Sequence, residues 1–282
     1  MLLMGLKVLK QIVFPIFLFS IASNLYAAEQ DSVKHKVYHV NFYVDIPVTI
    51  AITATHFWGL NIVHSKPPLD SLTIVSLDAN NINRFDRSAT WQDAGFAPTA
   101  RTISDFGMYG SYALPLLLLA DKKIRQDWGE LLVLFIQTQA TVGNLYSWGS
   151  AIHIDKIRPL VYHPDVPWDQ KTDNSTKNAF YSGHTSSSAS ASFFVAKVYC
   201  DYHPELGSRK YLFYSLALIP PVFTGFFRYK GMKHFPTDTM VGLIVGASTG
   251  ILIPHIHKIT RSNLAIFPFG GQVNGLALSL SF

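Results

Sequence analysis

Residues 228–238, with the sequence RYKGMKHFPTD, place an arginine, a histidine and an aspartate at a spacing that suits chemistry on an oxyanion. The ordinary pKa of histidine lies near neutrality, so His234 can attack an electrophile or move a proton. Asp238 is expected to hold one of its ring nitrogens, as the carboxylate does in a Ser-His-Asp triad. Arg228 adds a permanent, forked cation that suits phosphate. Taken alone, the spacing fits equally well a surface arginine beside a buried histidine without a catalytic role.

Two further motifs lie where predicted helices end or begin. Arg158-Pro159 occurs in HIDKIRPLVYHPD, and Ser182-Gly183-His184 occurs in FYSGHTSS. A glycine lets the backbone come close to a phosphate. A proline at position 236 favours a helix start, which would bring the positive end of that helix near His234.

The elements that must position these residues are segments without Asp, Glu, Lys or Arg. Six such segments predict helices, at 46–65, 106–120, 131–154, 178–196, 211–227 and 239–257. Several are long enough to span a bilayer, and 106–120 is short for that. The run HTSSSASAS in the fourth segment predicts close helix packing, because small residues let backbones approach. In an up-and-down bundle the ends near 155, 180, 227 and 239 lie on one side, so the three motifs are predicted to converge.

Together the motifs resemble the signature of the type 2 phosphatidic acid phosphatase superfamily, which includes bacterial acid phosphatases and vanadium haloperoxidases. That signature is a lysine, six residues and Arg-Pro; then Ser-Gly-His; then Arg, five residues, His, three residues and Asp. The second and third blocks match in full. The first block matches only in Arg158-Pro159, because Ala151 stands where the family has its lysine. The resemblance covers roughly residues 100–257.

The resemblance implies a role for each matched residue. His234 would be the nucleophile that forms a phosphohistidine, Asp238 would orient it, and His184 would be the general acid for the leaving alkoxide. No metal or other cofactor is implied, since arginines supply the positive charge. The groups implied to hold the phosphoryl oxygens are Arg158, Arg228, the Ser182 hydroxyl and the Gly183 backbone N–H.

The lysine that is missing at Ala151 leaves one position of the implied site open. Lys156, two residues before Arg158, is predicted to substitute for it and to bind phosphate. Lys230 and Lys233 are other candidates. Alternatively, all three lysines are solvated and the site has one cation fewer.

Composition narrows the classes of protein that fit. Hydrophobic residues make up 49% of the 282 residues and charged residues only 15%, against roughly 25% in a soluble domain. The balance favours a membrane protein or a deeply buried helical one. The sequence has no arginine-rich helix, which argues against nucleic acid as a partner. Its net charge of +5 suits an anionic substrate or an anionic membrane surface. The single Cys200 excludes an internal disulfide, and the remaining histidines form no convincing metal set.

The chain is divided into three parts by its patterns. Residues 1–27 predict a signal peptide, with an uncleaved N-terminal anchor as the alternative. Residues 28–262 are predicted to be the phosphatase domain. At 263–282, LAIFPF and LALSLSF flank GGQVNG, which predicts a C-terminal β-hairpin. The predicted fold class is therefore all-α, a six-helix bundle with a short hairpin, either spanning the membrane or associated with it after export.

The function expected from these features is metal-independent hydrolysis of a phosphomonoester or pyrophosphate. A lipid phosphate is the favoured substrate, at the periplasmic side of a bacterial envelope. Two alternatives remain open. One is a vanadate-dependent haloperoxidase, in which the same loops would hold vanadate. The other is a non-catalytic membrane scaffold that binds anionic lipid head groups, for which the pairing of His234 with Asp238 would not be needed.

Overall fold

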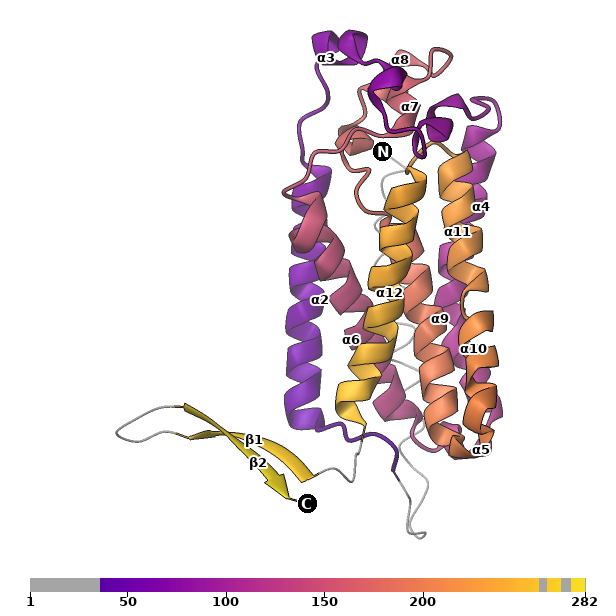
Figure 1. Cartoon of the computed structure of the whole chain (residues 1–282). Coiled ribbons are helices and arrows are strands. Elements are labelled where there is room, and N and C mark those ends of the chain that lie inside the picture. Colours follow the sequence, from indigo (N-terminus) through magenta and orange to yellow (C-terminus); the bar gives the residue numbers. More distant parts are fainter. Residues whose placement is uncertain (1–35, 259–262, 270–274, 282) are drawn as a thin grey trace, which may run out of the picture. The chain divides into compact units, whose positions relative to one another are not determined.

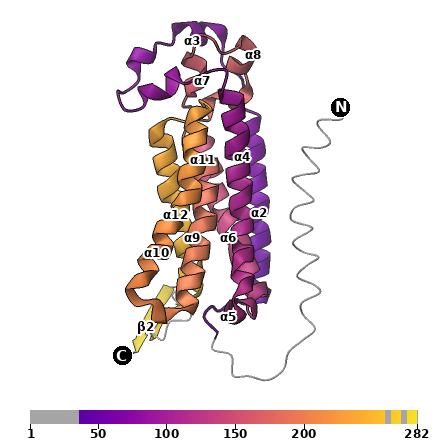
Figure 2. The same cartoon turned by 90° about the vertical axis from the view of Figure 1, so that its right-hand side faces the viewer.

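The computed structural model describes residues 36–258, 263–269 and 275–281. The predicted signal peptide lies outside the described residues. The long helices run side by side, as Figures 1 and 2 show from two directions. They are α2 (Phe42–His64), α4 (Ala97–Ala113), α6 (Trp128–Tyr146), α9 (Gly183–Tyr202), α11 (Ile219–Lys230) and α12 (Pro236–His257). The shorter helices are α3 (Ser71–Ser76), α5 (Lys122–Arg125), α7 (Pro159–Tyr162), α8 (Trp168–Lys171) and α10 (Lys210–Leu216).

The predicted fold class needs a correction at the C-terminus. Within residues 36–258 the chain forms helices, turns and isolated bridges, without a β-strand. The strands β1 (Asn263–Phe269) and β2 (Gly275–Ser281) pair antiparallel with each other alone, so they add no layer to the bundle. A lone two-stranded hairpin has no third strand to stabilise it. The described bundle is all-helical, and counting a hairpin as part of its fold was wrong.

The predicted count of six helices is also wrong, because proline interrupts two of the expected segments. The segment 211–227 is divided into α10 and α11, and α11 begins with proline in its first turn. Proline lacks the N–H that an unbroken helix would need there. The segment 106–120 begins earlier than expected, at Ala97, and continues after α4 as the 3₁₀ helix Leu114–Ala120, which has proline in its first turn.

Close packing of α9 against α12 fixes the relative positions of the elements that carry the motifs. Three glycines on α12, each four residues after the last, face backbone carbonyl oxygens of α9. A Cβ added at Gly242, Gly246 or Gly250 would lie 2.6, 2.1 or 2.5 Å from the carbonyl oxygen of Ser182, Ser186 or Ser190. The expectation that small residues bring these helices together is confirmed.

Three helices of the described residues are long and apolar enough to cross a membrane. They are Phe42–His64, Ala97–Ala120 and Pro236–His257. Large apolar side chains on α2, such as Ile50 and Trp58, are exposed on the bundle surface. Exposed apolar surface of this kind is typical of contact with lipid or a partner, and it supports association with a membrane.

Candidate active site

The three motifs meet at one end of the bundle, the end at which α12 and α9 begin (Figure 1). Backbone hydrogen bonds join the segments that carry them. Ser182 N–H donates to Asp238 O over 3.0 Å, Leu160 N–H donates to Met232 O over 3.0 Å, and Ala179 N–H donates to Lys156 O over 2.9 Å. The predicted convergence of these loops is therefore present in the described chain.

The ring of His234 is held in one tautomer by a backbone carbonyl. Its Nδ1 lies 2.6 Å from the carbonyl oxygen of Ala179. A carbonyl only accepts, so Nδ1 carries the proton and Nε2 of the neutral ring keeps its lone pair. Burial lowers the pKa of His234 well below its usual value, and the nearby Arg158 and Arg228 lower it further. The ring is only 2% exposed.

Asp238 has a different role from the one expected. Its carboxylate accepts the Phe235 N–H over 2.8 Å and the Lys156 Nζ over 2.6 Å, and neither contact is with the ring of His234. The orienting acceptor is instead the Ala179 carbonyl. Asp238 therefore fixes the start of α12 and the backbone directly after His234.

Lys156 lies between two carboxylates rather than beside the arginines as a phosphate ligand. Its Nζ is bound to Asp238 and lies 3.9 Å from Asp86. A backbone bridge pairs Lys156 with Asn178 and directs its side chain to the start of α12. Asp86 in turn accepts both the N–H and the hydroxyl of Thr237. These contacts make Lys156 a structural cation of the helix start.

Two buried guanidinium groups lie near enough to His234 to lower its pKa. Arg158 and Arg228 are 7% and 5% exposed. Each Nε is buried without an acceptor among the described residues. Burying a charged group is costly unless it is paired. Arg158 donates to the Ser175 hydroxyl over 3.2 Å, and Arg228 to the Ser104 hydroxyl over 3.3 Å. The one carboxylate paired with either guanidinium among the described residues is Asp105, 3.4 Å from Arg228 Nη1. Such a pair of cations favours an anion in front of His234.

His184 is paired with an aspartate that the sequence analysis missed. Its Nε2 lies 2.9 Å from Oδ1 of Asp105, and the same oxygen is 3.4 Å from Nη1 of Arg228. Asp105 lies on α4, far from the three motifs in sequence. The only signal in the sequence was its position at the border of a charge-free segment, and this gives no hint of a partner.

Ser182 and Gly183 begin α9. The Ser182 hydroxyl caps the helix by accepting the Thr185 N–H, and it lies 2.8 Å from the Thr185 hydroxyl. Gly183 lies under the ring of Tyr146, which is 3.4 Å from the place of an added Cβ. The helix start therefore presents backbone N–H groups at the end of the bundle where the arginines lie.

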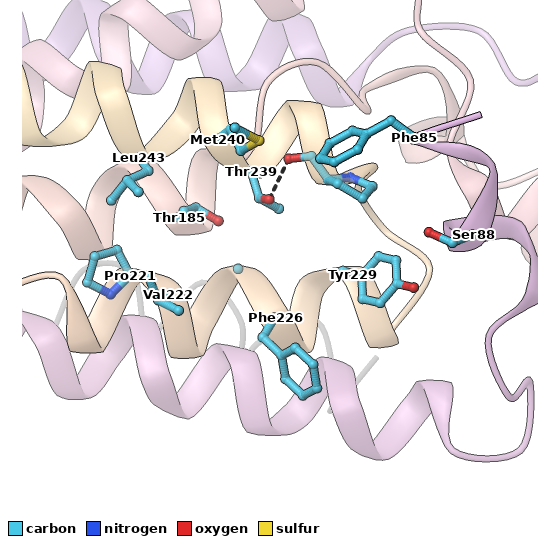
Figure 3. Close-up of a pocket in the computed structure, with 12 residues that line it drawn as sticks. Phe85, Ser88, Thr185, Pro221, Val222, Phe226, Tyr229, Thr239, Met240 and Leu243 are labelled. Carbon is cyan, nitrogen blue, oxygen red and sulfur yellow. Dashed lines mark hydrogen bonds between the residues drawn. The ribbon is translucent and has the colours of Figure 1, made fainter. Parts of the chain in front are cut away.

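A largely apolar groove lies between α11 and α12, beside the motif residues (Figure 3). Its volume is about 400 Å³. Phe226, Met240 and Leu243 contribute apolar side chains. Its wall also contains Thr185 and Thr239, each the residue directly after a motif residue.

The described residues contain no group of three His, Cys, Asp or Glu side chains that could hold a metal ion. The cationic groups at this site are side chains of the protein itself.

Comparison with known proteins identifies the matching family. The family model of the PAP2 superfamily matches residues 128–261. A crystal structure of a transmembrane PAP2-type phosphatidylglycerolphosphate phosphatase from Bacillus subtilis is similar to this chain, with 19% sequence identity and a TM-score of 0.44. The similarity covers 76% of this chain and 98% of that one. No curated protein sequence matches this chain.

Proposed function

Because residues 128–261 belong to the PAP2 superfamily, we propose that the protein is a metal-independent phosphatase that acts on a lipid phosphate at a membrane. The observation that carries the proposal is the state of His234. This ring is neutral, its Nδ1 proton is held by the Ala179 carbonyl so that Nε2 keeps its lone pair, and two buried arginines lie near it.

In the first step, Nε2 of His234 forms a bond to phosphorus while the bond from phosphorus to the ester oxygen breaks. The proton on the imidazolium of His184 passes to the leaving oxygen, so the lipid leaves as an alcohol. Arg158 and Arg228 hold the phosphoryl oxygens, where charge is concentrated in the transition state.

In the second step, water attacks the phosphohistidine and returns a proton to His184. The bond from His234 to phosphorus breaks, and inorganic phosphate leaves. Burial and the nearby Arg228 lower the pKa of His184 to about 4 in the empty site, and Asp105, which accepts a hydrogen bond from His184, opposes them. The negative charge of a bound phosphate adds to that of Asp105 and favours the imidazolium form from which the proton is delivered. The arrangement is that of a histidine nucleophile with a histidine acid on the facing loop.

A lipid substrate is favoured by the groove and by the three apolar helices. An acyl chain in the groove between α11 and α12 would leave its phosphate beside the start of both motif helices. The leader predicted from the sequence supports a site on the periplasmic side.

The proposal is tested by phosphate release in detergent and EDTA from phosphatidic acid, phosphatidylglycerolphosphate, a polyprenyl pyrophosphate and a soluble aryl phosphate. Release from at least one lipid, lost in His234→Ala but kept in His255→Ala, is the expected result. His255 is an exposed histidine near the other end of α12 and serves as the matched control. Release that survives in His234→Ala, or that needs a divalent metal, would contradict the proposal. Halide oxidation with vanadate in place of hydrolysis would favour a haloperoxidase.

A further inference from the structure

A lysine directly before the proposed nucleophile has an ammonium without a partner in the part of the chain that the structure describes. Lys233 lies between Met232 and His234 in the turn that joins α11 to α12. Met232 is fully buried and adopts a left-handed backbone conformation with φ of 53°, which turns the chain after α11. Among the described residues, the Lys233 ammonium has neither a hydrogen bond nor an ion pair within 4.0 Å.

The surroundings of this lysine are dominated by like charge. Burial, together with the nearby Arg158, Arg101 and Arg228, lowers the pKa of Lys233 to about 6. Asp173 opposes them only in part. With this pKa, Lys233 is largely neutral at pH 7 while the site is empty. An anion that binds among the three arginines and Lys233 favours the charged form of the lysine and so gains a fourth cation as a partner.

The other two lysines near the site are already engaged. Lys156 is bound to Asp238. Lys230 lies over aromatic rings, with its Nζ 5.8 Å from the centre of Phe226 and 5.9 Å from that of Tyr229. Ala151, where the family motif has a lysine, is fully buried and offers no charge.

We propose that Lys233 is the third phosphate-binding cation of this site and replaces the family lysine that is absent at position 151. The ammonium binds a phosphoryl oxygen together with the guanidinium groups of Arg158 and Arg228, whose Nε atoms are buried without an acceptor among the described residues. The identification of the anion as a phosphoryl group rests on the proposed function, whereas the anion site itself rests on the cations alone.

The test is binding of tungstate, a phosphate-shaped dianion, to the full-length protein in detergent. Calorimetry and the tungstate-induced rise in Tm are measured for the wild type, Lys233→Met, Lys233→Arg and the control Lys230→Met. A lost charge-assisted hydrogen bond corresponds to roughly 10- to 100-fold weaker binding in Lys233→Met. Lys233→Arg is expected to recover most of the affinity, and Lys230→Met to bind as the wild type does.

The Tm without tungstate separates binding from a merely structural role. Lys233→Met is expected to keep or raise this Tm, because the substitution replaces a partly buried amine, whose charged form burial and the arginines disfavour, with an apolar side chain of similar length. Unchanged tungstate binding in Lys233→Met, no binding by the wild type, or an equal loss in Lys230→Met would overturn the inference. If binding depends on Lys233 but no ester is hydrolysed, the inference stands and the proposed phosphatase activity fails. If hydrolysis depends on His234 but Lys233→Met binds tungstate as tightly as the wild type, only the inference fails.

Discussion

At the scale of single residues, the site depends on which atom holds each histidine. The Ala179 carbonyl fixes the tautomer of His234, and a carboxylate on α4 holds His184. The carbonyl leaves His234 neutral. Asp105 favours protonated His184, but burial and Arg228 outweigh it and lower the pKa of His184 to about 4 in the empty site. The two rings are thus suited to different tasks, one to attack and the other to deliver a proton.

Replacing the carboxylate with an amide tests this division of tasks. Asp105→Asn keeps an acceptor of the same shape but removes the charge that stabilises protonated His184. We expect kcat to fall about 10- to 100-fold, less than the roughly 10²- to 10⁴-fold that a general acid itself contributes, with little change in KM. Steady-state kinetics across pH would show the loss growing as pH rises through the lowered pKa of His184 in the variant and becoming constant above the wild-type value of about 4. Asp93→Asn, on an exposed turn, is the matched control, and an equal loss there would contradict a positioning role for Asp105.

The residue scale is also where prediction from the sequence was weakest. The motif residues were located by spacing and helix order, and the loops that carry them do converge. The contacts of these residues could not be predicted from spacing, because Asp238 and Lys156 pair with groups that only the folded chain brings near them. Asp105 belongs to no motif and comes from a helix outside the matched segment. Which carboxylate reaches which histidine is decided by tertiary packing, which spacing does not encode.

At the scale of elements, the contact between α9 and α12 determines how the Ser-Gly-His start faces His234. It rests on backbone atoms of α9 touching glycines of α12. Gly246→Ala would put a Cβ 2.1 Å from the Ser186 carbonyl oxygen, so the helices must separate. We expect a loss of about 1–3 kcal/mol in the free energy of unfolding, as for an overpacked core, together with lower activity.

The matched control for this substitution is on α4. A Cβ at Gly110 would meet nothing within 4 Å. Gly110→Ala should therefore leave stability unchanged or raise it by up to about 1 kcal/mol, because alanine favours helix. Denaturation in detergent followed by circular dichroism checks both variants. Equal stability of Gly246→Ala and the wild type would mean that this interface is looser than the structure shows.

Helices were predictable wherever absence of charge coincided with helix length. The segments at 46–65 and 239–257 lie almost within α2 and α12. The start of α4 was missed because Arg101 and Asp105 lie inside that helix and break the charge-free pattern. Arg101 donates to the Gly231 carbonyl and Asp105 pairs with His184, both at the motif-bearing end of the bundle. The charge-free pattern therefore failed where a helix carries charged residues that contact the motif segments.

At the scale of the whole molecule, an apolar bundle surface and a cationic site at one end suit a substrate with a hydrocarbon part and a phosphate part. Helices α2 and α12 and the span Ala97–Ala120 are apolar enough for a bilayer. The groove between α11 and α12 connects the two features, because its wall includes residues directly after His184 and Asp238.

A larger side chain in the groove should lower activity on lipid substrates and leave activity on soluble substrates unchanged. Met240→Trp adds bulk to the groove wall and is expected to lower kcat/KM for a lipid phosphate about tenfold or more, as loss of a buried hydrocarbon contact does. Hydrolysis of an aryl phosphate should not change. Ile244→Trp, at an exposed position of α12 outside the groove lining, is the control. An equal loss for both substrates would mean that the hydrocarbon binds elsewhere.

The most direct measurement of the central claim is a search for the covalent intermediate. Purified protein is mixed with substrate, quenched under alkaline conditions that preserve phosphohistidine, digested and sequenced by mass spectrometry. The account predicts a phosphoryl group on His234, absent in His234→Ala and accumulated in Asp105→Asn if hydrolysis of the intermediate slows more than its formation. Turnover with no modified His234 at any quench time, or a phosphoryl group on His184 instead, would contradict the account.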